Sequence, residues 1–322
     1  MPERPKEPTF YFIGVTTGQS SIMNIFPLWM KDLGFGQIRI AGCDIEPRGP
    51  REEYRRIVRH IRDEGNAVGG LVTTHKIDIV QAAYDLFTCF DEYARIFGEI
   101  SCISKKRGLL HGHAKDPISV GLALEAFLPP GYWADHAGAH AFIMGAGGSG
   151  LALSVFLMRK NHGRNIPSKI ILSNRRIERL DHARHVHNRV GRGSRVDYEQ
   201  VGHGRSNDDI IGSLPKGSLV VNATGMGKDS PGSPVSDDVL FPENGFVWEF
   251  NYRGGLDFFT QASAQKESRG LTVEDGWIYF IHGWTQVIGE VLGIELTEGD
   301  VERLSTIAKE RRGFIGSPPY VL

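Results

Sequence analysis

Short apolar runs alternate with amphipathic stretches along the first hundred residues. In the amphipathic stretches apolar side chains recur at helical intervals, as Tyr54, Ile57, Val58 and Ile61 do. The predicted strands span 9–16, 37–45 and 67–74, and the predicted helices span 21–33, 51–65 and a stretch from Lys76 onward. A strand–helix alternation of this kind predicts an α/β unit with a mostly parallel sheet.

The alternation is interrupted between residues 99 and 140. Residues 99–116 have the pattern of a β-hairpin, and residues 118–128 have that of a helix. The passage 129–140 is rich in proline and glycine and is the best candidate for a linker. We therefore expect one domain to end near residue 130.

A second alternation begins at Ala141. The predicted strands span 141–144, 169–176, 218–227 and 245–252, and the predicted helices start after Gly150 and span 177–190, 258–269, 277–292 and roughly 298–312. The chain thus holds two α/β units, and its last helices are expected to pack back on the first one.

Composition narrows the function classes. Among 322 residues, 37 Lys+Arg stand against 38 Asp+Glu, so no basic excess points to nucleic acid. No apolar run approaches the roughly 20 residues needed to span a bilayer, and the N-terminus lacks a signal-peptide core. Cys43, Cys89 and Cys102 form no disulfide pattern, which fits a reducing compartment. We expect a cytoplasmic protein that binds a small molecule and has neither nucleic-acid nor membrane partners.

A glycine motif follows the strand predicted at 141–144. Gly145, Gly147 and Gly150 fit G-x-G-x-x-G, where the glycines permit a tight turn, close approach of a pyrophosphate, and close helix–strand packing. The motif alone is weak, but a strand precedes it and a helix follows it. It predicts that the loop binds dinucleotide phosphates at a helix start through Gly145, Ala146, Gly147, Gly148, Ser149 and Gly150.

The next predicted strand ends in Asn174, Arg175 and Arg176, where an acidic ribose-binding residue often stands. Arginine there can bind a 2′-phosphate with a fork of donors, which favours NADP over NAD. Arg179 is expected to help. Glu178 can instead contact a ribose hydroxyl, so NAD stays the alternative.

Two charged residues stand where an active site would form. Lys76 follows the third strand, at the carboxyl edge where ligands of parallel sheets bind. It can exchange a proton if burial lowers its pKa, or it is a solvated lysine at a helix start. Asp116 begins a helix, where it is either an N-cap or a functional carboxylate.

Seven segments together resemble the shikimate dehydrogenase family, also called the quinate/shikimate dehydrogenases. In chain order they are GVTTGQSS, VTTHK, GEIS, GHAKD, GAGGSG, SNRRIER and NATGMG, and they cover nearly the whole chain. The resemblance implies that Lys76 and Asp116 are catalytic and that Ser20 binds substrate. It also implies cofactor contacts at Asn174, Arg175, Arg176, Arg179, Asn222, Ala223, Thr224 and Met226.

The chain departs from the family on the substrate side. Ile22 stands for a second serine, Ser101 for an asparagine and His282 for a glutamine; Val72 or Thr73 stands for a threonine, and Ala114 and Lys115 for an asparagine and a threonine. Lys115 and His282 can still hold a carboxylate. The predicted substrate-binding set is Ser20, Ile22, Thr73, Ser101, Lys115, Tyr252 and His282. Because buried polar partners would go unmatched, ordinary shikimate is expected to be a poor substrate.

The resemblance implies an α/β protein of two domains. An N-terminal substrate-binding α/β domain with a parallel sheet spans 1–130 and is completed by the C-terminal helices in 272–322; a Rossmann-type NADP-binding domain spans 131–271. The expected activity is hydride transfer between NADP and a cyclic carboxylated polyol such as shikimate, quinate or aminoshikimate. The alternative is an NADP-binding sensor or partner protein without turnover.

No metal site and no particular oligomer are indicated. His182, His185 and His187 lie close in sequence, but the first two alone share a helix face and no acidic third ligand is visible. A homodimer is compatible with the sequence.

Overall fold

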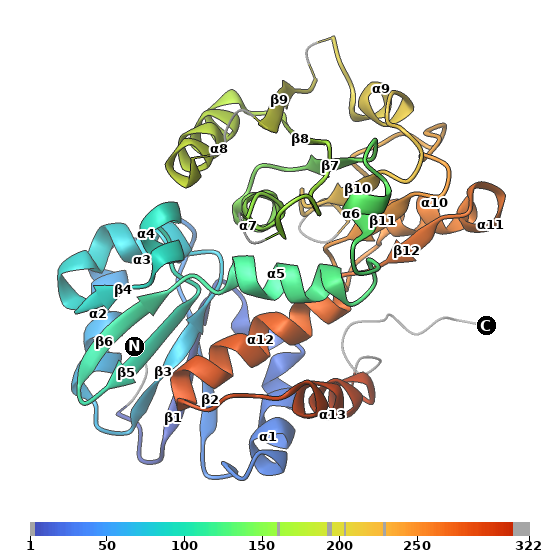
Figure 1. The fold of residues 1–322 in the computed structure, drawn as a ribbon. Coiled ribbons are helices and arrows are strands. Elements are labelled where there is room, and N and C mark those ends of the chain that lie inside the picture. The colour runs from blue at the N-terminus through green and yellow to red at the C-terminus, as the bar shows by residue number, and fades with distance from the viewer. Residues whose placement is uncertain (1–3, 160–161, 192–194, 203, 228–229, 312–322) are drawn as a thin grey trace. The chain divides into compact units, whose positions relative to one another are not determined.

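The computed structural model describes residues 4–159, 162–191, 195–202, 204–227 and 230–311. The chain forms two compact units, labelled in Figure 1 by their elements. Unit 1 comprises Met1–Lys115 and Gly283–Leu322, and unit 2 comprises Asp116–His282. The C-terminal segment therefore belongs to the same unit as the N-terminal one.

Unit 1 contains a six-stranded sheet in the order β2-β1-β3-β5-β6-β4. Its strands are β1 (Thr9–Gly14), β2 (Arg39–Asp44), β3 (Ala67–Val72), β4 (Cys89–Phe90), β5 (Cys102–Lys106) and β6 (Leu109–His113). β1 pairs in parallel with β2 and β3, whereas β5 is antiparallel to β3 and β6. The expected parallel sheet is thus a mixed one.

The hairpin between β5 and β6 explains the mixture. Lys106 pairs with Leu109, so Arg107 and Gly108 alone form the turn. Both have positive φ, 53° and 77°, as a two-residue type I′ turn requires. A turn this short cannot make a parallel crossover, so β6 must run antiparallel.

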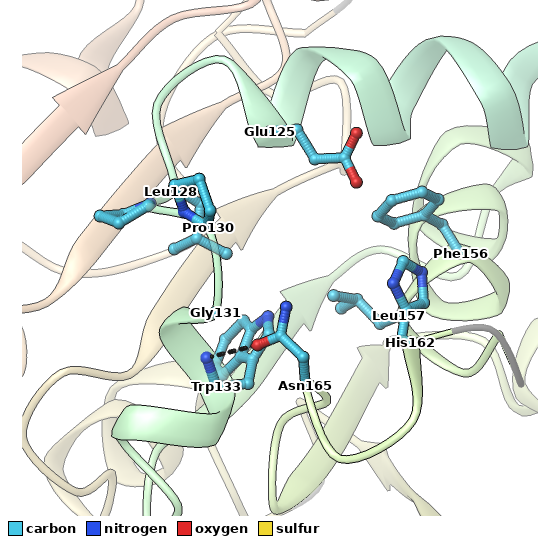
Figure 2. Close-up of a pocket in the computed structure, with 10 residues that line it drawn as sticks. Glu125, Leu128, Pro130, Gly131, Trp133, Phe156, Leu157, His162 and Asn165 are labelled. Carbon is cyan, nitrogen blue, oxygen red and sulfur yellow. Dashed lines mark hydrogen bonds between the residues drawn. The ribbon is translucent and has the colours of Figure 1, made fainter.

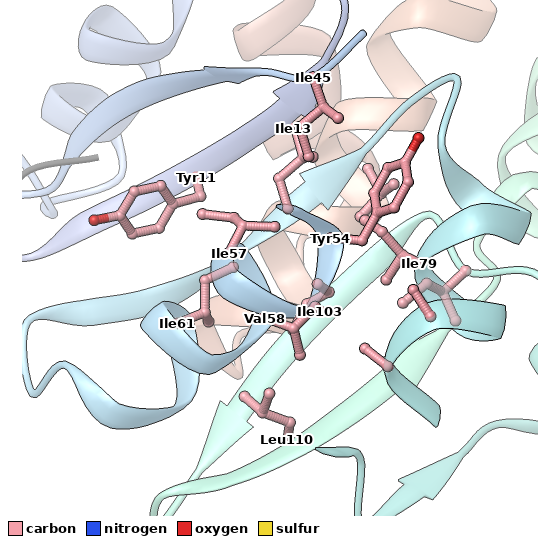
Figure 3. Packing of buried hydrophobic residues seen from close by; sticks show 14 of the residues in the cluster. Tyr11, Ile13, Ile45, Tyr54, Ile57, Val58, Ile61, Ile79, Ile103 and Leu110 are labelled. Atoms are coloured by element: carbon pink, nitrogen blue, oxygen red, sulfur yellow. The ribbon is translucent and has the colours of Figure 1, made fainter. Parts of the chain in front are cut away.

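Helices cover both faces of the unit 1 sheet: α1 (Ile22–Asp32), α2 (Arg51–Asp63), α3 (Lys76–Ala83), α4 (Glu92–Phe97), the second half of α12 (Trp277–Leu292) and α13 (Glu298–Lys309). Tyr11 and Ile13 of β1 face the α2 side, where they pack with Ile57 and Ile61 (Figure 3). A fully buried side chain of this size contributes about 1.5–3 kcal/mol relative to an exposed one.

The other face of β1 carries its alternate residues. Phe10 packs on Phe26 of α1, and Phe12 packs edge-on against Trp284 of α12. Trp29 of α1 donates through Nε1 to the carbonyl of Leu304 in α13, at 2.8 Å. The last two helices are therefore integral to the core of unit 1.

Unit 2 contains an all-parallel sheet in the order β12-β11-β10-β7-β8-β9. Its strands are β7 (His140–Met144), β8 (Lys169–Asn174), β9 (Val196–Gln200), β10 (Leu219–Asn222), β11 (Phe246–Glu249) and β12 (Thr272–Glu274). Counted from β7, this is the order 3-2-1-4-5-6 of a doubly wound dinucleotide-binding sheet. The expected Rossmann-type architecture is confirmed.

The helices of unit 2 are α5 (Asp116–Glu125), α6 (Tyr132–Asp135), α7 (Gly148–Leu157), α8 (Ile177–Val190), α9 (Asn207–Gly212), α10 (Asp257–Ala264), α11 (Lys266–Arg269) and the first turns of α12. The helix expected at 258–269 is thus two helices, which meet at Gln265. Residue 312, the expected end of the last helix, lies outside the described residues; α13 ends at Lys309. None of the helices that the structure describes is long and apolar enough to cross a membrane.

The predicted linker at 129–140 lies inside unit 2 and holds α6. The helix before it, α5, packs tightly on α7, because a Cβ at Gly121 would come within 2.1 Å of Phe156. This close helix packing explains why the compact unit begins at Asp116 rather than after the proline-rich passage.

Candidate active site

The glycine loop joins β7 to α7, and two of its glycines are required by backbone packing. Gly145 has φ 106°, and a Cβ there would lie 2.5 Å from the carbonyl oxygen of Ala223. A Cβ at Gly150 would lie 2.0 Å from the carbonyl oxygen of Gly145. Any side chain at either position would push the loop away from its neighbours.

Gly147 differs, because a Cβ there would meet no atom within 4 Å. It is the N-cap of α7, with φ −82° and ψ −177°, and no side chain caps the helix. The first N–H groups of α7 therefore have no side-chain cap beside an open space. Such a cradle suits the negative charge of a pyrophosphate, so these residues fit a dinucleotide.

The arginines after β8 extend into solvent. Asn174 accepts a hydrogen bond from the backbone N–H of Arg176 at 2.9 Å, and Gln200 donates to the carbonyl of Arg175 at 3.2 Å. The side chains of Arg175, Arg176 and Arg179 are exposed. The loop backbone is thus fixed while three guanidinium groups stay accessible to an anion.

The turn after β10 is held by a buried network. Asn222 donates through Nδ2 to Glu249 at 2.6 Å, and its Oδ1 accepts from the Thr224 hydroxyl at 2.6 Å. Asn251 donates to Glu249 through its backbone N–H and to the Met226 carbonyl through its side chain. Sequence reasoning missed Glu249 and Asn251; the signal was an acidic residue ending the apolar run Phe246–Trp248.

Burial raises the pKa of Glu249 to about 7, against the lowering effect of its bonds to Asn251 and Asn222. This carboxyl has 1 % of its surface exposed. Its ionisation therefore changes near neutral pH, which is unusual for a glutamate.

In unit 1, Lys76 is the first residue of α3 and is half-buried. Thr74, two residues before it, has φ 52°, a conformation rare for a β-branched residue. His75 has no exposed surface; its Nε2 lies 2.9 Å from the carbonyl of Ile45, and its Nδ1 lies 3.2 Å from the Tyr54 hydroxyl. These contacts fix the loop that presents Lys76.

Several predicted substrate residues are engaged inside unit 1. Ile22 has no exposed surface and packs in the core, and Ser20 is 8 % exposed. The Ser101 hydroxyl accepts from the backbone N–H of Lys115 at 2.8 Å. Lys115 itself forms a 2.7 Å salt bridge with Glu290 of α12.

Glu290 also lies 3.2 Å from the ammonium of Lys106. Burial acts to raise the pKa of Glu290, but Lys115, His113 and Lys106 outweigh it and hold the pKa at about 2. This charged cluster borders a pocket of about 470 Å³ that α12 and residues 294–296 help to line. Thr73, also in the predicted set, is half-buried and donates its backbone N–H to the Ile13 carbonyl.

The remaining predicted site residues belong to unit 2. Asp116 begins α5 and is half-buried. The Tyr252 ring packs on Phe280 at 4.7 Å, and the carbonyl of His282 accepts from Ser119. Burial lowers the pKa of His282. Because Lys76 lies in unit 1 and Asp116 in unit 2, their pairing stays a prediction.

The three histidines of α8 are dispersed. His187 bridges Ser154 of α7 at 2.8 Å and Tyr198 of β9 at 2.7 Å. His182 is half-buried and His185 exposed. In the described part of the chain, no three His, Cys, Asp or Glu residues are grouped to hold a metal ion.

Figure 2 shows a further pocket of about 360 Å³. Phe156 and Leu157, which line it, are at the end of α7 that is away from the glycine loop. Glu125, Trp133, Phe156 and His162 line it, and Asn165 accepts from the backbone N–H of Trp133 at 2.9 Å. It is separate from the glycine loop, because one helix length lies between them.

Comparison with known proteins gives a consistent result. No family model matches the chain. It is 28% identical over 272 residues to the NADP(+) shikimate dehydrogenase of Rhodopseudomonas palustris strain ATCC BAA-98 / CGA009, covering 84% of this chain and 85% of that one. The fold resembles quinate dehydrogenase from Corynebacterium glutamicum in complex with NAD, with TM-score 0.73, 21% identity, and coverage of 94% and 99% of the two chains.

The fold also resembles ligand-free 5-ketofructose reductase of Gluconobacter sp. strain CHM43, with TM-score 0.66, 17% identity, and coverage of 95% and 99%. The fold, the sequence relatives and the ordered motifs together define the class as NAD(P)-dependent oxidoreductases. The chain is similar, as a distant relative, to the shikimate/quinate dehydrogenases.

Proposed function

We propose that this protein is an NADP-preferring dehydrogenase that oxidises a secondary alcohol of a cyclic carboxylated polyol, or reduces the corresponding ketone. The observation that carries the proposal is the glycine loop. At Gly145 and Gly150 the neighbouring backbone leaves no room for a side chain, whereas Gly147 borders open space at the start of α7. That division of roles is the one a dinucleotide pyrophosphate requires.

The cofactor would be held by this chain at three places. The N–H groups of Gly148, Ser149 and Gly150 would bind phosphate, and Arg175, with Arg176 or Arg179, would bind the 2′-phosphate of NADP. The turn Asn222–Met226 would border the nicotinamide end. Bound there, the nicotinamide supplies or accepts the hydride.

The proton would be exchanged by Lys76. As the first residue of α3 it stands at the carboxyl edge of the unit 1 sheet, and the buried His75 loop fixes its backbone. Asp116 would hold a neighbouring substrate hydroxyl and orient the ammonium. A carboxylate favours the charged lysine and desolvation the neutral one, so the two effects can tune a proton exchange near working pH.

The substrate class is inferred from relatives named for shikimate and quinate. The 5-ketofructose of a third relative has no carboxylate and does not bear on this class. The Ser101 hydroxyl accepts from the backbone N–H of Lys115, and the Lys115 ammonium is paired with Glu290. Fewer polar groups are therefore left to bind substrate than the family pattern has. We expect shikimate itself to be turned over poorly. Homodimer formation and a cytoplasmic location stay predictions.

The test combines cofactor titration with a substrate panel. NADPH and NADH binding is followed by fluorescence, and shikimate, quinate and aminoshikimate are assayed with both oxidised cofactors. Tighter binding of NADPH and turnover of one ring substrate support the proposal. Dinucleotide binding without turnover of any ring compound would favour a sensor that keeps the fold, and absence of binding would overturn the proposal.

A further inference from the structure

Glu249 is a buried carboxyl that the proposed chemistry does not use. It ends β11, and its two oxygens accept from Asn222 Nδ2 at 2.6 Å and from the backbone N–H of Asn251 at 2.7 Å. Both partners are neutral amides, and Asp275, between β12 and α12, adds repulsion of the same sign. Burying a carboxylate with such partners is costly, so the residue needs an explanation.

The carboxylate holds the turn Asn222–Met226 at both ends. Asn222 connects it to Thr224, whose hydroxyl also accepts from the Met226 N–H at 3.1 Å. From the other side, Asn251 connects it to the Met226 carbonyl at 2.8 Å. The conformation of the turn therefore depends on the arrangement around Glu249.

The Asn222–Met226 turn also contacts the glycine loop. Ala223 donates its N–H to the carbonyl of Met144 at 2.8 Å. The space beside Gly145 is filled by Ala223 and Thr224, since a Cβ there would lie 2.5 Å from one and 2.9 Å from the other. A displacement of the turn would consequently alter the wall of the glycine loop.

We propose that Glu249 is a positioning residue whose ionised carboxylate holds the Asn222–Met226 turn in the form that accepts a dinucleotide, and that protonation of this carboxyl releases the turn. The inference rests on the dinucleotide binding proposed above. It adds a proton-sensitive control of cofactor affinity located in unit 2.

Protonation disrupts the network because both neighbours of the carboxyl are donors. A protonated carboxyl can still accept, but its new O–H needs an acceptor, and the backbone N–H of Asn251 cannot become one. The Asn251 side chain could accept only by giving up its bond to the Met226 carbonyl. The Asn222 amide cannot usefully rotate, because its Oδ1 already accepts from the N–H and the hydroxyl of Thr224. Turning it would set one N–H against another, so a neutral Glu249 leaves a buried donor unmatched.

The pH window follows from the direction of the shift. The pKa of Glu249 is raised from 4.5 to about 7, so the carboxyl is ionised above this pH and neutral below it. Dinucleotide affinity should be full near pH 8 and should fall as pH drops through 7. If the ionised form alone binds, the affinity at pH 6 is about tenfold weaker than at pH 8.

The experiment titrates NADH and NADPH into the whole protein between pH 6 and 8. NADH is the decisive ligand, because the 2′-phosphate of NADPH can itself titrate near pH 6, as phosphate monoesters do. Glu249→Gln mimics the neutral carboxyl, and Glu274→Gln is the matched control, since burial also raises the pKa of Glu274 on the adjacent strand β12. We expect weak, pH-independent NADH binding in Glu249→Gln and wild-type behaviour in Glu274→Gln.

The outcomes separate the two proposals. A flat wild-type NADH affinity from pH 6 to 8, or a Glu249→Gln variant with the wild-type pH profile, overturns the role of Glu249 and leaves the dehydrogenase proposal standing. Absence of dinucleotide binding at every pH overturns both. Circular dichroism checks folding, and if Glu249→Gln does not fold, the wild-type profile decides.

Discussion

The candidate functional groups of the two units differ in kind: one half is mostly backbone and the other is mostly side chains. In unit 2 the cradle is backbone, shaped by glycines that cannot carry a side chain and by a turn held from beneath by Asn222, Glu249 and Asn251. In unit 1 the candidate groups are side chains, and Ser101 and Lys115 already have partners within the unit.

This contrast explains why one half keeps the family pattern and the other departs from it. A backbone cradle binds what all dinucleotides share, so its geometry stays useful whatever the substrate. Side-chain contacts read the hydroxyls and carboxylate of one particular substrate, and each replacement changes which molecule fits. The substrate side is therefore where we expect this chain to differ in function from its relatives.

The largest expected effect is on the side-chain half. Lys76→Ala should lower kcat by roughly 10²–10⁴-fold, the usual contribution of a positioned acid or base. NADPH affinity and melting temperature should stay unchanged, as they should in the control Lys31→Ala, an exposed lysine of α1. Steady-state kinetics on the identified substrate measure this, and near-normal kcat would remove Lys76 from the mechanism.

Two variants of the glycine loop separate its two expected roles, backbone packing and dinucleotide binding. Gly150→Ala should lower the free energy of unfolding by about 1–3 kcal/mol or more, because the new Cβ meets the Gly145 carbonyl at 2.0 Å. That clash outweighs the gain of about 1 kcal/mol from alanine's helix propensity.

Gly147→Ala should lower the free energy of unfolding by at most about 1 kcal/mol, as a poorer N-cap whose Cβ enters open space, yet weaken dinucleotide binding at least tenfold. Urea unfolding and fluorescence titration measure the pair. Equal dinucleotide affinity in Gly147→Ala and wild type would show that the open space is not the pyrophosphate site.

The folding stability of unit 2 should decrease in acid because of His187, which bridges α7 and β9. Burial lowers the pKa of His187 from 6.5 to about 4, so the unfolded chain takes up a proton before the folded one does. Stability from this group is full above pH 6.5 and is lost as pH falls toward 4, by about 3 kcal/mol in total.

Urea unfolding of wild type and His187→Gln at pH 7.5 and 5 isolates this effect. The stability difference between them should shrink at pH 5. Glu249 has the opposite sign, because its raised pKa makes acid stabilising, and the variant comparison cancels its contribution. A difference that does not change with pH would contradict the account of His187.

Much of the fold could be predicted from the sequence. The order of strands and helices, the glycine loop and the ends of α8 and α12 follow local patterns, since 177–190 and 277–292 are the bounds observed. Short elements were missed: α4, β9, α9 and β12 have too few residues for a periodic pattern. The mixed sheet depends on the two-residue turn at Arg107 and Gly108.

The site could be predicted as far as its chemistry is local. Gly145 and Gly150 have the close backbone contacts that the motif implies and Gly147 borders open space, while dinucleotide binding stays a prediction. The Glu249 network and the Lys115–Glu290 pair could not be predicted, because they join residues 27 and 175 positions apart in the sequence. Sequence patterns report which face of an element is buried, but not which buried polar groups meet across elements.

A smaller effect should appear at the arginines that border the cradle. Arg175→Ala should weaken NADPH about tenfold or more, as loss of a charge-assisted hydrogen bond does, and leave NADH unchanged. Arg184→Ala is the control, because Arg184 is an exposed arginine of α8 already paired with Asp181. Unaltered preference in Arg175→Ala would mean that the 2′-phosphate is bound elsewhere or that NAD is the cofactor.

The smallest expected effect concerns Lys115. It tests whether this lysine is held by Glu290 within unit 1 or binds substrate. Lys115→Met should lower the free energy of unfolding by about 1 kcal/mol, a small cost for a buried pair, because Lys106 still neutralises Glu290 and water reaches the cluster. Substrate KM should change little. Urea unfolding at pH 7 and kinetics on the identified substrate separate the roles. A tenfold rise in KM with unchanged stability would instead make Lys115 a substrate-binding residue, and the contrast between the two halves would then be smaller than their hydrogen bonds suggest.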